Sequence, residues 1–178
     1  MELYLIRHGI AQQRGLDIKD EQRSLTKEGR QKTERIAQKL VKLGLQFDLI
    51  VTSPLVRARQ TAEILIAEKL SSQLEESSHL APDGNISSWL INWLEPRNYS
   101  QNTQLALVGH EPNLSIWAET LLWGTEILTS ESRSRELSEA KAVLVLKKAG
   151  MIGIKLPEAG SPLGRSQMFW LTPPKYLL

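Results

Sequence analysis

The chain has 178 residues, of which 41% are apolar and 24% are charged, a composition typical of a folded globular protein that excludes a disordered or fibrous class. This length suits one hydrophobic core, so we expect a single domain over residues 1–178. The 22 basic and 20 acidic residues nearly balance, which argues against nucleic acid or an anionic membrane as partner and leaves anion binding to a local cluster.

The sequence shows no sign of a membrane segment or of export. Its apolar runs are far shorter than the roughly 20 residues of a membrane helix. Arg7 and His8 interrupt the apolar start of the chain, so we expect no secretory signal. The absence of cysteine excludes disulfide bonds and thiolate metal sites, which fits a cytoplasmic location.

The chain opens with a short apolar strand, expected over residues 2–6, which ends where polar residues begin. Residues 10–24 carry charges without a clear period and predict a loop over the end of this strand. Thr26 is the expected N-cap of a first helix, and the helical spacing of apolar residues continues until Gly44.

A second strand is expected over residues 47–52 and leads into a second helix. Ser53 and Pro54 form a helix-start signature, because serine caps helices and proline suits their first turn. The helical pattern then runs to about Leu70 and places Arg57 in the opening turn.

The middle of the chain repeats this order twice. Residues 74–80 form a weak candidate strand before a short helical pattern over residues 86–94. A clearer buried strand, residues 104–109, is followed by a helix that continues to Leu122. Four strand-then-helix units predict an α/β protein, a three-layer α/β/α sandwich around a mainly parallel sheet.

The tail has a different pattern. Two apolar runs, residues 142–146 and 151–156, are joined by a short polar segment, which predicts an antiparallel hairpin at the edge of the sheet. Residues 168–171 are expected to form a final strand.

The polar residues that suggest chemistry all follow expected strands. In open α/β sheets, ligands bind beyond the carboxyl ends of the strands, and helix N-termini add N–H donors and positive partial charge there. These positions predict one phosphate-sized anion site built from Arg7, His8, Ser53, Arg57 and His110.

Two guanidinium groups can bind a phosphate dianion and leave one imidazole free to attack phosphorus. We assign this nucleophile to His8 and expect His110 to bind phosphate oxygens as an imidazolium. Gly9 would allow the backbone to approach a bound oxyanion closely. No set of acidic residues and histidines at ligand spacing accompanies the arginines, so we expect neither a metal nor a cofactor.

These residues also resemble a known family, the histidine phosphatase superfamily with its phosphoglycerate mutase-like fold. The resemblance rests on three motifs in order, namely Arg7-His8-Gly9 after a strand, the block VTSPLVRARQTA over residues 51–62, and VGHEP over residues 108–112. It implies that His8 is transiently phosphorylated, that Arg7, Arg57 and His110 bind the phosphoryl group, and that Ser53 belongs to the same site.

The short chain is similar to the SixA-type phosphohistidine phosphatases in particular, because mutases carry larger insertions. The glutamate that protonates the leaving oxygen in many members has no clear match. Asp83 and Glu111 are the candidates for this acid, and Glu111 also suits a helix start. Arg23 is either a contact for the substrate or a solvated loop charge.

The sequence therefore predicts a phosphatase that removes phosphate from phosphohistidine on a signalling or phosphotransfer protein. A first alternative keeps the chemistry and takes a small phosphomonoester as substrate. A second alternative is a module that recognises a phosphorylated partner without hydrolysing it, although the complete set of site residues argues against a mere binder.

Overall fold

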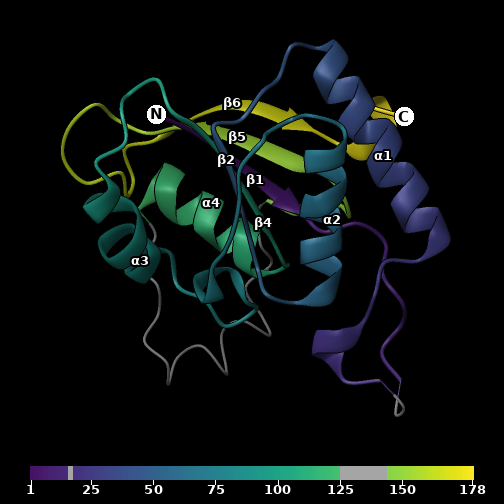
Figure 1. Cartoon of the computed structure of the whole chain (residues 1–178). Helices are drawn as coiled ribbons and strands as arrows, with labels where there is room; N and C mark the ends of the chain where they lie inside the picture. Colours follow the sequence, from purple (N-terminus) through teal and green to yellow (C-terminus); the bar gives the residue numbers. More distant parts are fainter. Residues whose placement is uncertain (16–17, 125–143) are drawn as a thin grey trace.

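The computed structural model describes residues 1–15, 18–124 and 144–178 (Figure 1). Within these residues, six strands form one sheet in the order β3-β2-β4-β1-β5-β6. Their bounds are β1 (Glu2–Arg7), β2 (Leu49–Thr52), β3 (Leu74–Glu76), β4 (Gln104–Gly109), β5 (Met151–Lys155) and β6 (Gln167–Thr172). The strands β1 to β4 run parallel, whereas β5 is antiparallel to both β1 and β6.

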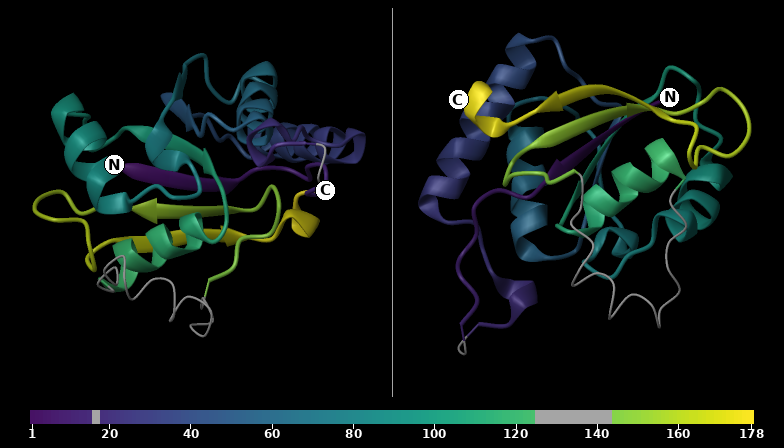
Figure 2. Two further views of the ribbon diagram at one scale, coloured as in Figure 1. Left: turned by 90° about the horizontal axis from the view of Figure 1, so that it is seen from below. Right: turned by 180° about the vertical axis from the view of Figure 1, so that it is seen from behind.

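Helices cover both faces of the sheet, as Figure 2 shows from two further sides. The α-helices are α1 (Lys27–Lys42), α2 (Val56–Ala67), α3 (Ile86–Trp89) and α4 (Asn113–Trp123). Shorter helical turns are η1 (Asp20–Gln22), η2 (Ser78–Leu80), η3 (Leu90–Leu94), η4 (Glu95–Arg97) and η5 (Pro174–Tyr176). In the described ranges, none of the helices combines the length and the apolar character that crossing a membrane requires.

Alternation along the central strands separates two cores. Leu3 and Leu5 of β1 pack with α3 and α4, whereas Tyr4 and Ile6 pack with α1 and α2 on the other face. Because β1 is apolar on both faces, it belongs in the middle of a sheet that helices cover on both sides. This arrangement confirms the predicted α/β/α sandwich.

The first helix begins as predicted. The Oγ1 atom of Thr26 accepts a hydrogen bond from the backbone N–H of Gly29 at 2.9 Å. Gly29 also lies against the carbonyl of Ile10, where a Cβ atom would be only 2.0 Å from the oxygen. This close approach ties the loop that follows β1 to the start of α1.

The second helix begins two residues later than expected. Helix α2 begins at Val56 with Leu55 in the N-cap position, and Ser53 lies in the connection before it. The hydroxyl of Ser53 turns instead toward His110, with 2.8 Å between Ser53 Oγ and His110 Nε2. This tertiary contact with His110, which follows the neighbouring strand β4, outweighs the local capping preference.

The third strand is shorter than predicted, whereas the predicted helical segment over residues 86–94 is helical throughout. Strand β3 covers only Leu74–Glu76, and residues 78–80 form the turn η2. The α-helix over Ile86–Trp89 then continues as a π-helical turn over Leu90–Leu94.

The predicted hairpin of the tail is wrong. Residues 144–146 are not a strand, and residues 142–143 lie outside the described part of the chain. Strand β5 has β1 on one side and β6 on the other, so it has no free edge for residues 144–146. The antiparallel pair at the edge is therefore β5 with β6, which includes the predicted final strand.

Candidate active site

Three parallel strands end side by side and bring the predicted residues together. The register pairs Arg7 with Gly109 and Thr52 with Val108, so that His8, Ser53 and His110 follow at neighbouring strand ends. The ring centroids of His8 and His110 are 5.1 Å apart. The structure thus brings His8, Ser53 and His110 together at one edge of the sheet.

The hydrogen bonds of His8 define which ring nitrogen can react. Its Nδ1 atom lies 2.7 Å from the carbonyl oxygen of Gly9. Since a carbonyl oxygen only accepts hydrogen bonds, Nδ1 carries the proton. The Nε2 atom then presents a lone pair, toward which Arg57 donates its Nε–H at 3.3 Å.

Both site histidines are neutral in this arrangement. Burial, reinforced by the charges of Arg57 and Arg7, lowers the pKa of His8 to about 3. Burial, together with His8 and Arg57, likewise lowers the pKa of His110 to about 3. The expected imidazolium form of His110 is therefore not the form that the ligand-free site favours, because nearby cations oppose a further positive charge.

His110 offers a hydrogen-bond donor on its second nitrogen. Ser53 Oγ accepts from the backbone N–H of Leu55 at 3.3 Å, so its own proton can be donated to His110 Nε2. The ring proton of neutral His110 then resides on Nδ1, which is buried and has no hydrogen-bond partner among the described residues. Such a donor suits an oxyanion.

Arg57 lies in the first turn of α2 and is buried. Its two terminal nitrogens donate to the backbone carbonyl of Asp20 at 2.7 Å and to the carboxylate of Asp20 at 3.0 Å. The guanidinium group thus joins the His8 ring to the loop that follows β1. In Figure 1 this loop, in purple, extends away from the sheet past α2.

Asp20 is a site residue that sequence reasoning missed. Besides Arg57, its carboxylate accepts from Arg23 at 2.6 Å and from Arg14 at 2.9 Å. Burial alone would raise the pKa of Asp20, but the hydrogen bonds from Arg23, Arg14 and Arg57 hold it below its ordinary value. The spacing of Asp20 and Arg23 within a charged loop was the available signal.

Arg23 is accordingly neither free nor fully solvated. Its Nε atom donates to the carbonyl of Gln12 at 2.7 Å, in addition to the contact with Asp20. Arg23 therefore stabilises the loop, and the carboxylate of Asp20 connects it to Arg57.

Arg7 is half-buried, and its Nη1 atom donates to the carbonyl of Leu146 at 2.7 Å. Its Nε atom is buried and makes no hydrogen bond to the described residues. Desolvation lowers the pKa of Arg7, and the negative charge of Glu111 opposes this effect. The guanidinium group remains a cation with a donor to offer at the end of β1.

The two candidate acids differ in their surroundings. Glu111 is half-buried, accepts a hydrogen bond from Ser115 at 2.9 Å, and has its pKa raised by burial. Asp83 is exposed and makes no hydrogen bond or ion pair within the described ranges. Burial thus gives Glu111 the surroundings of a proton donor, whereas Asp83 is the exposed candidate.

The expectation for Gly9 requires a correction. Its N–H donates to Thr61 Oγ1 at 3.0 Å and is not available to a bound oxyanion. A Cβ atom at this position would lie only 2.5 Å from Thr33 Oγ1. The glycine therefore permits close packing between β1, α1 and α2.

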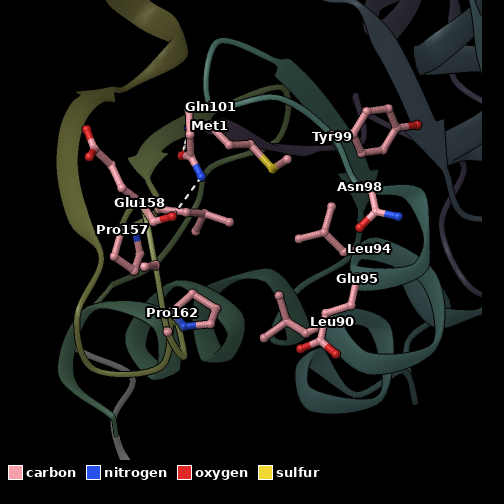
Figure 3. A pocket seen from close by; sticks show the side chains of 13 residues that line it. Met1, Leu90, Leu94, Glu95, Asn98, Tyr99, Gln101, Pro157, Glu158 and Pro162 are labelled. Atoms are coloured by element: carbon pink, nitrogen blue, oxygen red, sulfur yellow. Dashed lines mark hydrogen bonds between the residues drawn. The ribbon is translucent and has the colours of Figure 1, made fainter.

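Apart from the site residues, a pocket lies at the opposite end of the strands (Figure 3). Its volume is about 220 Å³, and its walls include Met1, Leu94, Tyr99 and Pro157. These residues flank the amino ends of β1 and β4, so none of the predicted site residues reaches this pocket.

Comparison with known proteins adds the family. Residues 3–81 match the sequence model of the histidine phosphatase superfamily (branch 1). The chain belongs to the histidine phosphatase superfamily. As a member of this superfamily it is a phosphatase.

Relatives of this superfamily member extend over its whole length. An uncharacterised protein of Picosynechococcus is 41% identical and aligns with 100% of this chain and 99% of its own. The structure of the protein histidine phosphatase SixA complexed with tungstate has a TM-score of 0.75 at 20% identity and covers 100% of both chains. A putative alpha-ribazole-5'-P phosphatase from Escherichia coli has a TM-score of 0.65 at 16% identity, with 98% of both chains covered. These similarities confirm the phosphoglycerate mutase-like fold.

Neutral, buried histidines make the stability of this phosphatase depend on pH. Below pH 6.5 the unfolded chain takes up protons that His8 and His110, with pKa values of about 3, do not bind when folded. The free energy of unfolding should therefore decrease as the pH falls from 6.5 to 5, by up to ~1.4 kcal/mol per pH unit for each histidine. Urea titrations at several pH values give the free energy of unfolding of the wild type and of His8→Asn. This free energy should change less steeply with pH in the variant, and an equal pH dependence would contradict the neutral, buried state of His8.

The carboxylate of Asp20 uses the same guanidinium donors that a phosphate would use. Asp20→Asn should therefore tighten the binding of inorganic phosphate by roughly ten-fold, or about 1.4 kcal/mol. Isothermal titration calorimetry measures this, and Glu21→Gln in the same exposed turn is the matched control. Weaker binding in Asp20→Asn would show instead that Asp20 orients Arg57 for the phosphate.

Proposed function

We propose that this phosphatase hydrolyses phosphohistidine on a protein, by way of a phosphoryl group carried transiently on His8. One observation carries the proposal. The ring of His8 is buried and neutral, with its proton directed to the carbonyl of Gly9 and its Nε2 lone pair directed toward Arg57. An imidazole held in this state is a nucleophile ready to react.

In the first step, His8 Nε2 attacks phosphorus and the P–N bond to the substrate imidazole breaks. When the substrate phosphohistidine is protonated on its other ring nitrogen, its imidazole leaves as a neutral group. Negative charge on the equatorial oxygens is stabilised by Arg7, by Arg57 and by the Nδ1–H of His110. Ser53 holds the His110 ring through its hydroxyl group.

In the second step, water attacks phosphorus on His8 and the new P–N bond breaks. Dihydrogen phosphate is released, and His8 returns to its neutral form with the proton on Nδ1. The hydrogen bond to Gly9 supports both steps, because the phosphorylated ring carries positive charge next to that carbonyl oxygen.

The leaving group explains why a phosphohistidine substrate suits this site. The conjugate acid of an imidazole has an ordinary pKa of about 6.5, so this group departs far more easily than an alkoxide. A strong general acid is then unnecessary. The missing family glutamate is therefore compatible with efficient hydrolysis of phosphohistidine.

A small phosphomonoester is the second candidate substrate. The observation in its favour is Glu111, which has a raised pKa and lies within the charge field of Arg7. In this alternative, Glu111 protonates the departing oxygen. The fold that the chain shares with a putative alpha-ribazole-5'-P phosphatase is also compatible with this class of substrate.

Turnover decides between the two substrates. We expect kcat/KM to be higher for a phosphohistidine-bearing phosphotransfer domain than for each member of a panel of sugar phosphates and nucleotides. Rapid quenching and mass mapping should locate the transient phosphate on His8, and His8→Asn should abolish turnover. Faster hydrolysis of a small ester would refute the proposed substrate, and phosphate on another residue would refute the mechanism.

Glu111→Gln separates the two leaving groups. Hydrolysis of an alkyl phosphate should fall by roughly 10²- to 10⁴-fold, because an amide cannot supply the proton that an alkoxide needs. Hydrolysis of phosphohistidine should change little. Asp83→Asn, the other candidate acid, serves as control, and a selective loss of ester hydrolysis in that variant would move the assignment to Asp83.

A further inference from the structure

A groove of about 700 Å³ opens beside Arg7, on the outer side of the active site. Four lysines line it together with Arg7, namely Lys32, Lys147, Lys148 and Lys175. Acidic side chains are absent from its walls as far as the chain is described. With a net charge of only +2 on the whole chain, this is a marked local concentration of positive charge.

The lysines of one wall are held in place relative to the nucleophile. The N–H of Arg7 donates to the carbonyl of Gly150 at 3.0 Å, and the N–H of Ala149 donates to the carbonyl of Arg7 at 3.0 Å. The side chain of Arg7 adds its bond to Leu146. The turn that carries Lys147 and Lys148 is therefore attached to the residue that precedes His8.

Other lining residues come from α1 and the C-terminal turn η5, which lie together in Figure 1. Lys32 of α1 already forms an ion pair with Glu28. Lys147, Lys148 and Lys175 are exposed and form no ion pair within the described residues. Three cations thus remain to meet an anionic partner.

The rest of the lining of the groove is apolar. It consists of Ile10, Val145, Pro173, Pro174 and Leu178. Val145 is 60% exposed and Leu178 is 53% exposed, although both are fully apolar side chains. An exposed apolar surface rimmed by charge is typical of a surface that binds another protein.

We propose that this groove binds an acidic segment of the phosphorylated protein substrate that also carries apolar residues, beside the phosphorylated histidine. The proposal rests on the proposed function and specifies its substrate class. Carboxylates of the segment meet Lys147, Lys148 and Lys175, and its apolar side chains cover Val145 and Leu178. The apolar part of the lining does not suit the phosphate backbone of a nucleic acid, which requires polar and charged contacts along its length.

Binding can be measured separately from turnover. The probe is a fluorescein-labelled peptide of glutamate and leucine residues around a non-hydrolysable phosphohistidine analogue, with a second peptide in which lysine replaces glutamate. Fluorescence anisotropy should show at least ten-fold tighter binding of the acidic peptide to the wild type. The double variant Lys147→Glu/Lys175→Glu should lose this preference, and Lys39→Glu/Lys42→Glu at the end of α1 is the matched control.

Kinetics provide the second readout. With an acidic phosphohistidine domain, the double variant should raise KM about ten-fold with kcat nearly unchanged, whereas hydrolysis of p-nitrophenyl phosphate should stay within two-fold.

Equal affinity for both peptides, or an unaffected double variant, would overturn the proposed groove. Loss of turnover on phosphohistidine in the wild type, with the peptide preference intact, would refute only the proposed function. If a small dicarboxylate displaced the peptide and bound with equal affinity, the groove would be a subsite for a small molecule, and the proposed protein partner would be refuted.

Discussion

The site depends on the parallel register of three strands. Strand β4 lies between β1 and β2, and the pairing of Arg7 with Gly109 and of Thr52 with Val108 aligns the ends of all three. A shift of one residue in either pair would turn every side chain to the opposite face. The apolar alternation that fills two cores therefore also sets the distance between the histidines.

Positive charge inside a buried site must be balanced. Burial and neighbouring guanidinium groups keep both imidazoles neutral, and the carboxylate of Asp20 neutralises part of the arginine charge. The loop after β1 provides this carboxylate, and its attachment to Arg57 links the order of the loop to the state of the site. Farther out, Lys147, Lys148 and Lys175 of the groove form no ion pair within the described residues. The protein itself thus balances part of the charge of the inner site, whereas these three lysines of the groove leave their charge to a partner.

Much of this architecture could be predicted from local patterns. Strand β4 was predicted to the residue, and the capping of α1 by Thr26 was recognised, because both depend on neighbouring residues. Ser53 was misassigned as a helix cap because its preferred partner, His110, lies 57 positions away. The hairpin of the tail failed for a similar reason, since which strands flank β5 is decided by the sheet. Asp20 escaped notice because its spacing from Arg23 was the only local signal, and its contact with Arg57 joins residues 37 positions apart.

The sequence by itself determined the sandwich architecture, the order of the motifs and the family to which they belong. The architecture follows from periodicity, caps and residue types that act over short distances, whereas the family follows from the resemblance of the three ordered motifs. Only the tertiary structure decided the protonation of His8 and His110, the ion pairing of Arg57 with Asp20, and the burial of Glu111 in contrast to the exposure of Asp83. Protonation and pairing depend on burial and on charges from distant segments, and these become defined only when the strands are aligned. The cationic groove likewise exists only because residues 145–148 and the C-terminal turn come together beside Arg7.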